Sequence, residues 1–283
     1  MPKTERYVGR ASKKDVRVSN KPNKINKPNK SKENKMVKLM NYKLLIQYDG
    51  TKLNGWQKQG NTDNTIQGKL EAILERMYGE YVEIHGSGRT DAGVHALGQV
   101  ANFHAPDKFS TEEILTTLNE YLSKDIRVLK VEIVDERFHA RLTAKGKTYE
   151  YRIDNGAIAN VFHRKFVMRE EDPLDLDAMR TAASYFIGTH DFKTFCANKK
   201  MKKSTVRTIT SIDIKENDGI VAIRYTGNGF LYNMVRILTG TLIEVGRGKR
   251  QTSEMEEIIG AMDRGFAGFT APAQGLFLVN VDY

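Results

Sequence analysis

The sequence predicts an α+β fold made of two α/β halves. Along residues 42–135, strand and helix patterns follow in the order strand, helix, strand, strand, helix, strand. From residue 147 onward, a second series of strands and helices uses similar parts. Each helix carries an apolar stripe, so it can cover one face of a sheet and share a core with it.

The first half is expected to contain four strands and two helices. Its strands are predicted at residues 42–48, 81–84, 94–103 and 126–134. The first helix ends at Gly79 and has apolar residues at helical spacing, namely Ile66, Leu70, Ile73, Leu74 and Met77. Ser110 and Glu113 form a capping-box pattern, which predicts the start of the second helix before Ile114.

The second half is expected to contain four strands and three helices. Its strands are predicted at residues 147–153, 208–215, 220–226 and 276–281. Asn217-Asp218-Gly219 is typical of the tight turn of a hairpin. Its helices are predicted at residues 176–186 (ending at Gly188), at 231–245, and after a cap formed by Ser253 with Glu256.

Composition restricts the class of protein. The single cysteine, Cys196, allows no intramolecular disulfide, so a reducing cytoplasm is the expected setting. No apolar run is long enough to span a bilayer, and no secretory signal is visible. The six histidines are scattered without a metal-ligand spacing, so no metal site is expected.

The net charge of +10 lies in residues 1–39. That segment has 13 Lys or Arg and three acidic residues, which leaves 32 basic and 32 acidic residues in 40–283. It repeats Lys-Pro-Asn units and has few large apolar residues, so we expect a disordered basic tail. Such a tail either grips phosphates or is an extension without a role, and Met36 and Met40 are both plausible start sites.

The most informative segment is Gly86-Ser87-Gly88-Arg89-Thr90-Asp91-Ala92-Gly93-Val94-His95. Its glycines bend a loop between two predicted strands and present an arginine and an aspartate. A tight turn with a surface ion pair is the simplest interpretation. A phosphate-binding loop is excluded, because Val94-His95 stands where Lys-Ser/Thr is needed.

The same decamer resembles the signature of the tRNA pseudouridine synthase A family, in which Gly-Arg-Thr-Asp-Ala-Gly-Val-His carries the catalytic aspartate. The similarity runs from about Met40 to Tyr283. It includes Tyr48-Asp49-Gly50-Thr51, Gly55-Trp56-Gln57, Phe138-His139-Ala140-Arg141, Lys147-Thr148-Tyr149-Glu150-Tyr151 and Gly229-Phe230-Leu231-Tyr232-Asn233-Met234-Val235-Arg236.

The resemblance implies the pseudouridine synthase fold. In that fold two related halves with antiparallel-rich sheets join across a central basic cleft, with helices on the outer faces. We therefore expect an N-terminal half at residues 40–140, which carries the aspartate, and a C-terminal half at residues 141–283.

The resemblance also implies a reaction. Such enzymes isomerise uridine to pseudouridine at positions 38 to 40 of the tRNA anticodon stem-loop. They act as homodimers on tRNA and need no cofactor, because no redox step or phosphate transfer occurs. One alternative is a catalytically silent RNA-binding protein on the same scaffold, and another is a metal-dependent nuclease. A nuclease would need clustered carboxylates or histidines, which Asp91 lacks in the nearby sequence.

Four residues are the candidates for the active site. By resemblance, Asp91 is the nucleophile and Arg236 pairs with it, although most helix arginines simply face solvent. Tyr149 would stack on the uracil and could take its C5 proton, whereas an ordinary strand tyrosine belongs to the core. Arg89 would fill the gap left by a flipped base, or would hold Asp91 ionised as an ion-pair partner.

A further set of residues is expected to contact RNA. Aromatic and cationic side chains close together suit phosphates and exposed bases. The predicted contacts are Phe138, His139, Ala140, Arg141, Leu142, Lys199, Lys200, Lys108 and Phe109.

Overall fold

A computed structural model describes residues 38–198 and 200–283. Almost all of the predicted basic tail lies outside the described residues, so its disorder stays a prediction. The described residues belong to one compact unit. Every helix in the described part falls short of the length or the apolar character that a membrane span requires.

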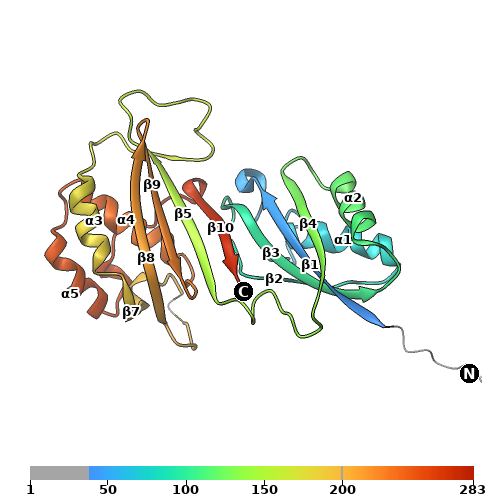
Figure 1. The fold of residues 1–283 in the computed structure, drawn as a ribbon. Coiled ribbons are helices and arrows are strands. Elements are labelled where there is room, and N and C mark those ends of the chain that lie inside the picture. Colours follow the sequence, from blue (N-terminus) through green and yellow to red (C-terminus); the bar gives the residue numbers. More distant parts are fainter. Residues whose placement is uncertain (1–37, 199) are drawn as a thin grey trace, which may run out of the picture. The chain divides into compact units, whose positions relative to one another are not determined.

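One mixed sheet of ten strands runs through this unit (Figure 1). Its strands are β1 (Leu39–Tyr48), β2 (Ile84–Gly86), β3 (His95–Pro106), β4 (Ile126–Val134), β5 (Gly146–Asp154), β6 (Met168–Arg169), β7 (Gly188–Asp191), β8 (Val206–Asn217), β9 (Ile220–Gly227) and β10 (Leu276–Asp282). The order across the sheet is β4-β1-β3-β10-β5-β9-β8-β7, with β2 added to β3 and β6 added to β5. The expected α+β fold is confirmed.

The C-terminal strand joins the two halves. β10 pairs with β3 in parallel and with β5 in antiparallel orientation. Apart from that parallel pair and the short β5–β6 pair, all pairings are antiparallel. The sheet is therefore continuous from β4 to β7, and the division into halves at residue 140 stays a prediction.

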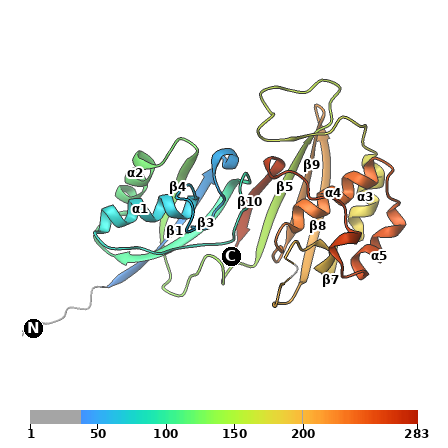
Figure 2. The ribbon, with the colours of Figure 1, turned by 180° about the vertical axis from the view of Figure 1, so that it is seen from behind.

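The helices divide between the two ends of this sheet (Figures 1 and 2). They are α1 (Ile66–Tyr78), α2 (Thr111–Tyr121), α3 (Leu176–Ser184), α4 (Met234–Gly246) and α5 (Met255–Gly260). α1 and α2 pack together, with α2 against β4, whereas α3 contacts α4 and β8. Each helix buries its apolar stripe, as amphipathic spacing predicts.

Local signals placed most element boundaries correctly. The Thr65 side chain caps α1, and Gly79 ends it in the left-handed region at φ 76°. Both hydrogen bonds of the Ser110–Glu113 capping box are present at α2. Asp218 and Gly219 both have positive φ between β8 and β9, as a two-residue hairpin turn requires.

Several boundaries differ from prediction by one to three residues. Three differences have a local explanation. Val82 and Ile84 are buried as the alternation at 81–84 suggested, but pairing with β3 starts only at Ile84. α4 begins at Met234 rather than at residue 231, because Asn233 adopts the left-handed conformation. The last helix follows a 3₁₀ turn whose capping box uses Gln251 and Glu254, so the predicted cap by Ser253 and Glu256 is wrong.

The glycine-rich loop between β2 and β3 packs directly on the segment that follows β1. Gly50 is buried there, and a Cβ at this position would lie 2.0 Å from the carbonyl oxygen of Val94. A contact this close leaves room only for hydrogen. Gly50 therefore sets the distance between the two segments.

We expect Gly50→Ala to destabilise the protein by about 1–3 kcal/mol, because the added methyl overpacks a backbone contact. The matched control is Gly60→Ala, since a methyl group at Gly60 would have nothing within 4 Å. Urea unfolding measures both free energies of unfolding. Equal stabilities for the two variants would contradict this account of Gly50.

Candidate active site

The loop that carries Asp91 is held by backbone contacts with the segment after β1. Trp56 N donates to the carbonyl oxygen of Thr90 at 3.0 Å, and Gly93 N donates to that of Leu53 at 3.3 Å. The Thr90 hydroxyl lies 2.8 Å from Tyr48 Oη. These bonds bracket Asp91 on both sides, so its backbone is fixed while its side chain faces the cleft.

A second network fixes the start of the loop. Ser87 Oγ donates to Gln99 Oε1 at 2.6 Å, and Gln99 Nε2 donates to the carbonyl oxygen of Gly88 at 3.1 Å. Lys147 Nζ donates to the carbonyl oxygen of Ser87 at 2.7 Å. Ser87 and Gln99 are fully buried, so polar groups that would be costly to leave unpaired are satisfied here.

Asp91 makes an ion pair across the two halves. Arg236 Nη1 lies 3.4 Å from Asp91 Oδ2, although the two residues are 145 positions apart. Arg236 is in the first turn of α4, and its Nε donates to the carbonyl oxygen of Ala271 at 2.7 Å. Its Nη1 also lies 3.1 Å from Asn233 Oδ1. The guanidinium is thus oriented before any ligand arrives.

Burial and the ion pair act on Asp91 in opposite directions. Loss of water raises the pKa of its carboxyl, while the charge and hydrogen bond of Arg236 lower that pKa, and burial has the larger effect. The net pKa is above the ordinary aspartate value. Arg236 therefore opposes the protonation that burial favours.

Arg89 does not take part in this ion pair. Its side chain is exposed and lines the cleft, and no salt bridge joins it to Asp91. The surface pair between Arg89 and Asp91, considered from the sequence alone, is not formed. Its guanidinium is available to a ligand instead.

Tyr149 reaches the site from β5. The strand register runs from Ala96 through Leu278 to Tyr149, which places Tyr149 two strands, or about 10 Å, from the residue that follows the Asp91 loop. Its ring packs edge-to-face on Phe230, with centroids 5.3 Å apart. Tyr149 is 9% exposed and lines the cleft, whereas Tyr151 is fully buried and donates to the carbonyl oxygen of Pro272.

The phenol of Tyr149 is held in its neutral form. Burial raises its pKa most, and the neighbouring Tyr48 and Asp91 raise it further. A resting phenolate is therefore disfavoured at neutral pH. This weakens the expectation that Tyr149 takes a proton from C5 and leaves its stacking face as the supported feature.

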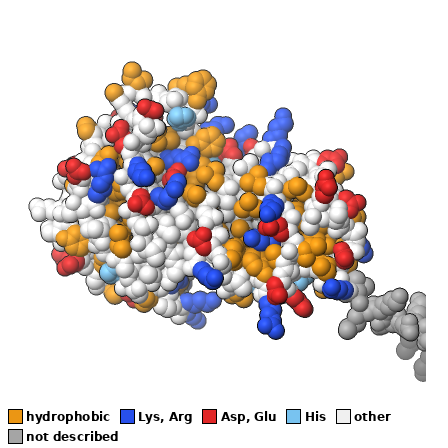
Figure 3. All heavy atoms as spheres, in the orientation of Figure 1, with side chains coloured by type: hydrophobic (Ala, Val, Ile, Leu, Met, Phe, Trp, Pro, Cys, Tyr) orange, Lys and Arg blue, Asp and Glu red, His pale blue; other side chains and the backbone are white. Residues whose placement is uncertain are grey.

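These residues line one open cleft of about 1400 Å³. The described lining holds only two carboxylates, Glu83 and Asp91. Its cations are Arg89, Arg141, Lys147, Lys200, Lys202, Lys203, Arg207 and Arg236. On the face seen in Figure 3, by contrast, basic, acidic and hydrophobic side chains are interspersed. The expected basic cleft is confirmed, and it favours a polyanionic ligand.

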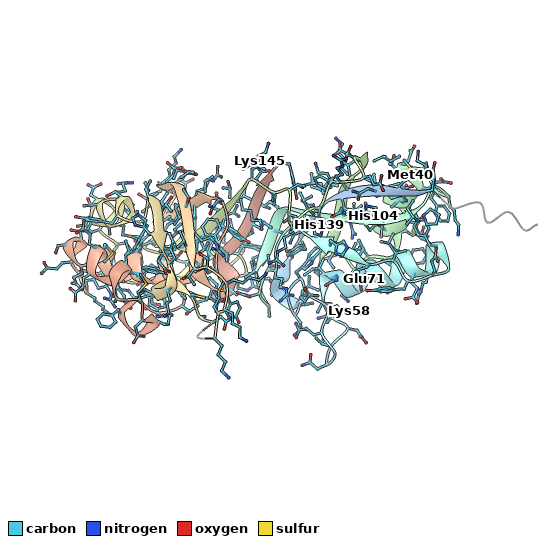
Figure 4. The ribbon with its side chains drawn as sticks, turned by 90° about the horizontal axis from the view of Figure 1, so that it is seen from below. Met40, Lys58, Glu71, His104, His139 and Lys145 are labelled. Carbon is cyan, nitrogen blue, oxygen red and sulfur yellow. The ribbon has the colours of Figure 1, made fainter. Side chains whose placement is uncertain are left out.

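Some of the predicted RNA contacts line the cleft and others lie elsewhere. His139, Arg141, Leu142 and Lys200 line the cleft, and the ring of His139 stacks on that of His85, with centroids 4.9 Å apart. His139 lies near His104 on the first half (Figure 4). Lys199 lies outside the described residues.

The remaining predicted contacts are not in the cleft. Ala140 is fully buried and Phe138 is partly buried against Tyr283, and their contact with RNA stays a prediction. Lys108 and Phe109 follow the far end of β3, about 35 Å along the strand from the Asp91 loop. Phe109 packs on Tyr78.

Sequence reasoning did not name four cations of the cleft as site residues, namely Lys147, Lys202, Lys203 and Arg207. Lys147 stands two residues before Tyr149, and strand alternation would have placed both on one face. Within the described residues, no group of three or more His, Cys, Asp or Glu could hold a metal ion.

Comparison with known proteins shows to which family this sequence is similar. A sequence model of a family described as tRNA pseudouridine synthase matches residues 44–142 and 182–283. A Bacillus sp. protein named tRNA pseudouridine synthase A is 50% identical over 86% of this chain and 99% of its own length. A Bacillus cereus protein named tRNA pseudouridine synthase A 2 is 47% identical over the same shares.

A Clostridium tetani relative named tRNA pseudouridine synthase A 1 is 45% identical over 87% of this chain and 100% of its own length. The family match includes Arg89 and Asp91 in its first segment and Arg236 in its second. This chain belongs to the tRNA pseudouridine synthase family.

Proposed function

We propose that this protein isomerises uridine to pseudouridine in the tRNA anticodon stem-loop, at positions 38 to 40, with Asp91 as the nucleophile. The observation that carries the proposal is the ion pair between Asp91 and Arg236 in the lining of a basic cleft. Family membership supports the reaction, and the cation-rich lining supports an RNA substrate.

The reaction is an isomerisation, so all atoms of the uracil are retained. The bond between N1 and the sugar C1′ breaks, the base turns, and a new bond forms between C5 and C1′. C5 loses a proton and N1 gains one, so the proton count is unchanged. Attack of the Asp91 carboxylate on the sugar and a glycal route both satisfy this balance, and neither requires a cofactor.

Asp91 has the properties that a nucleophile needs. It must be ionised and fixed in position, and the backbone bonds on either side of it fix the loop. Arg236 supports ionisation in a site where burial opposes it. A partly desolvated carboxylate is more reactive than one surrounded by water, because less solvent must be displaced.

Tyr149 and Arg89 support recognition of a flipped base. A uridine in a stem must leave its stack to reach Asp91, which costs a few kcal/mol. The neutral ring of Tyr149 offers a stacking face in the cleft. Arg89 is exposed and free of Asp91, so its planar guanidinium is available to fill the vacated place in the stem.

The proposal includes a homodimer in the cytoplasm as the working form. Resemblance to the family supports the dimer, and the single cysteine of the sequence is compatible with a reducing compartment. A catalytically silent RNA-binding protein is the weaker alternative. A carboxylate repels phosphate, so such a protein would gain nothing from Asp91 in its cleft.

We expect Asp91→Asn to abolish pseudouridine formation while tRNA affinity changes less than about threefold. The amide keeps the shape of the side chain but lacks the nucleophilic charge. Chemical mapping of pseudouridine in an unmodified tRNA transcript measures the product, and filter binding measures the affinity. Asp213→Asn is the control, because Asp213 is exposed on β8 outside the cleft lining. Near-normal product from Asp91→Asn would rule out the proposed role.

We expect Arg89→Lys to be almost as defective as Arg89→Ala on a paired target uridine, because an ammonium cannot stack as a plane. On a substrate whose target uridine is unpaired, both defects should shrink, since less stacking must be broken. Single-turnover rates on the two substrates measure this. If Arg89→Lys keeps near-normal rates on the paired substrate, Arg89 acts through its charge and not through flipping.

A further inference from the structure

Three cations from separate parts of the chain converge beside the Asp91 loop. Arg141 comes from the loop between β4 and β5, Lys147 from β5, and Arg207 from β8. All three line the cleft, and both arginines lower the pKa of Lys147 through their charge. None of them has an acidic partner among the ion pairs of the described residues.

Lys147 stands in an unfavourable place for a cation. Burial and the two arginines lower its pKa to about 8. One hydrogen bond, to the carbonyl oxygen of Ser87, satisfies one of its three donors. Among the described residues no carboxylate pairs with Lys147 to offset this loss of hydration, so its charge is not neutralised within the protein.

Lys147 lies close to the two candidate active-site elements, the Asp91 loop and Tyr149. A Cβ added at Gly88 would lie 3.0 Å from its ammonium, so Lys147 stands against the loop just before Arg89 and Asp91. It also shares a strand face with Tyr149, two residues further along β5. A group bound at Lys147 would therefore adjoin the nucleotide that occupies the cleft.

We propose that Lys147, Arg141 and Arg207 form a subsite for one backbone phosphate of the RNA, next to the target nucleotide. The subsite rests on the proposed function, because a bound uridine places its own phosphates along this wall. A phosphate supplies the missing negative charge and enough acceptors for the unused ammonium donors. Because Lys147 also holds Ser87, phosphate binding and the position of the Asp91 loop are coupled.

The test combines protein variants with RNA in which single phosphates are neutralised. Anticodon stem-loop RNAs with one methylphosphonate at each position around the target uridine are bound to Asp91→Asn protein, which prevents turnover. At one position we expect a loss of affinity of about tenfold or more. Adding Lys147→Met should reduce that loss to about threefold or less, because the phosphate then keeps only the two arginines as partners.

Arg141→Met and Arg207→Met should each reduce the loss at the same position, and they do not disturb the Ser87 bond. Lys145→Met is the control, since Lys145 is exposed and outside the cleft lining (Figure 4). If every methylphosphonate causes the same fold loss of affinity with and without Lys147→Met, the two changes are independent. Lys147 then only holds the loop, and the subsite is overturned. Pseudouridine formation by the wild-type protein, measured separately, tests the proposed function itself.

The pH dependence of binding gives a second readout. In the protein without RNA, Lys147 has a pKa of about 8, so it is charged below that pH and neutral above it. The affinity for RNA should therefore fall between pH 7 and 9. The charged groups around Lys147 are Arg141 and Arg207, with Arg89 next to Gly88 in the loop. Lys147→Arg should abolish the loss of affinity, and an unchanged loss in Lys147→Met would contradict the subsite.

Discussion

The ion pair between Asp91 and Arg236 is the interaction on which the site depends. A carboxylate in a half-buried cleft tends to protonate, and a protonated aspartate is not a nucleophile. The guanidinium that opposes this belongs to α4, in the other half of the chain. The fold must therefore hold two distant segments within hydrogen-bonding range.

The sheet provides that constraint through β10. This strand pairs with β3 at His95 and Ala96, immediately after the Asp91 loop, and with β5 at Tyr149. One continuous set of backbone hydrogen bonds thus fixes the loop and the tyrosine relative to each other. On the other side, Gly50 allows the segment after β1 to approach the loop at backbone distance. The Asp91 loop is held from both sides, which limits the reorganisation that a bound nucleotide would require.

Local sequence patterns predicted much of the fold because caps, turns and stripes are local. The capping box of Ser110 and the turn at Asp218-Gly219 needed no tertiary information. The insertion of β10 between the two halves could not be derived from periodicity, since strand order depends on contacts between distant residues. The family resemblance supplied only that the two sheets join.

The site shows the same limit. Sequence proximity suggested Arg89 as a partner of Asp91, but on a loop bent by glycines neighbouring side chains diverge, and Arg236 makes the contact. The role of Arg236 came from resemblance, and the cluster around Lys147 was not foreseen as a unit. Its members come from three separate segments, which only the folded chain brings together.

We infer that Arg236, and not Arg89, keeps Asp91 ionised. The direct measurement is the pH dependence of the single-turnover rate for the wild type, Arg236→Met, Arg236→Lys and Arg89→Ala. Without Arg236 the pKa of Asp91 rises further, so the acidic limb of the Arg236→Met profile should move to higher pH, and Arg236→Lys should restore part of it. Arg89→Ala should lower the rate without moving that limb. A limb that moves in Arg89→Ala and stays in place in Arg236→Met would contradict the account.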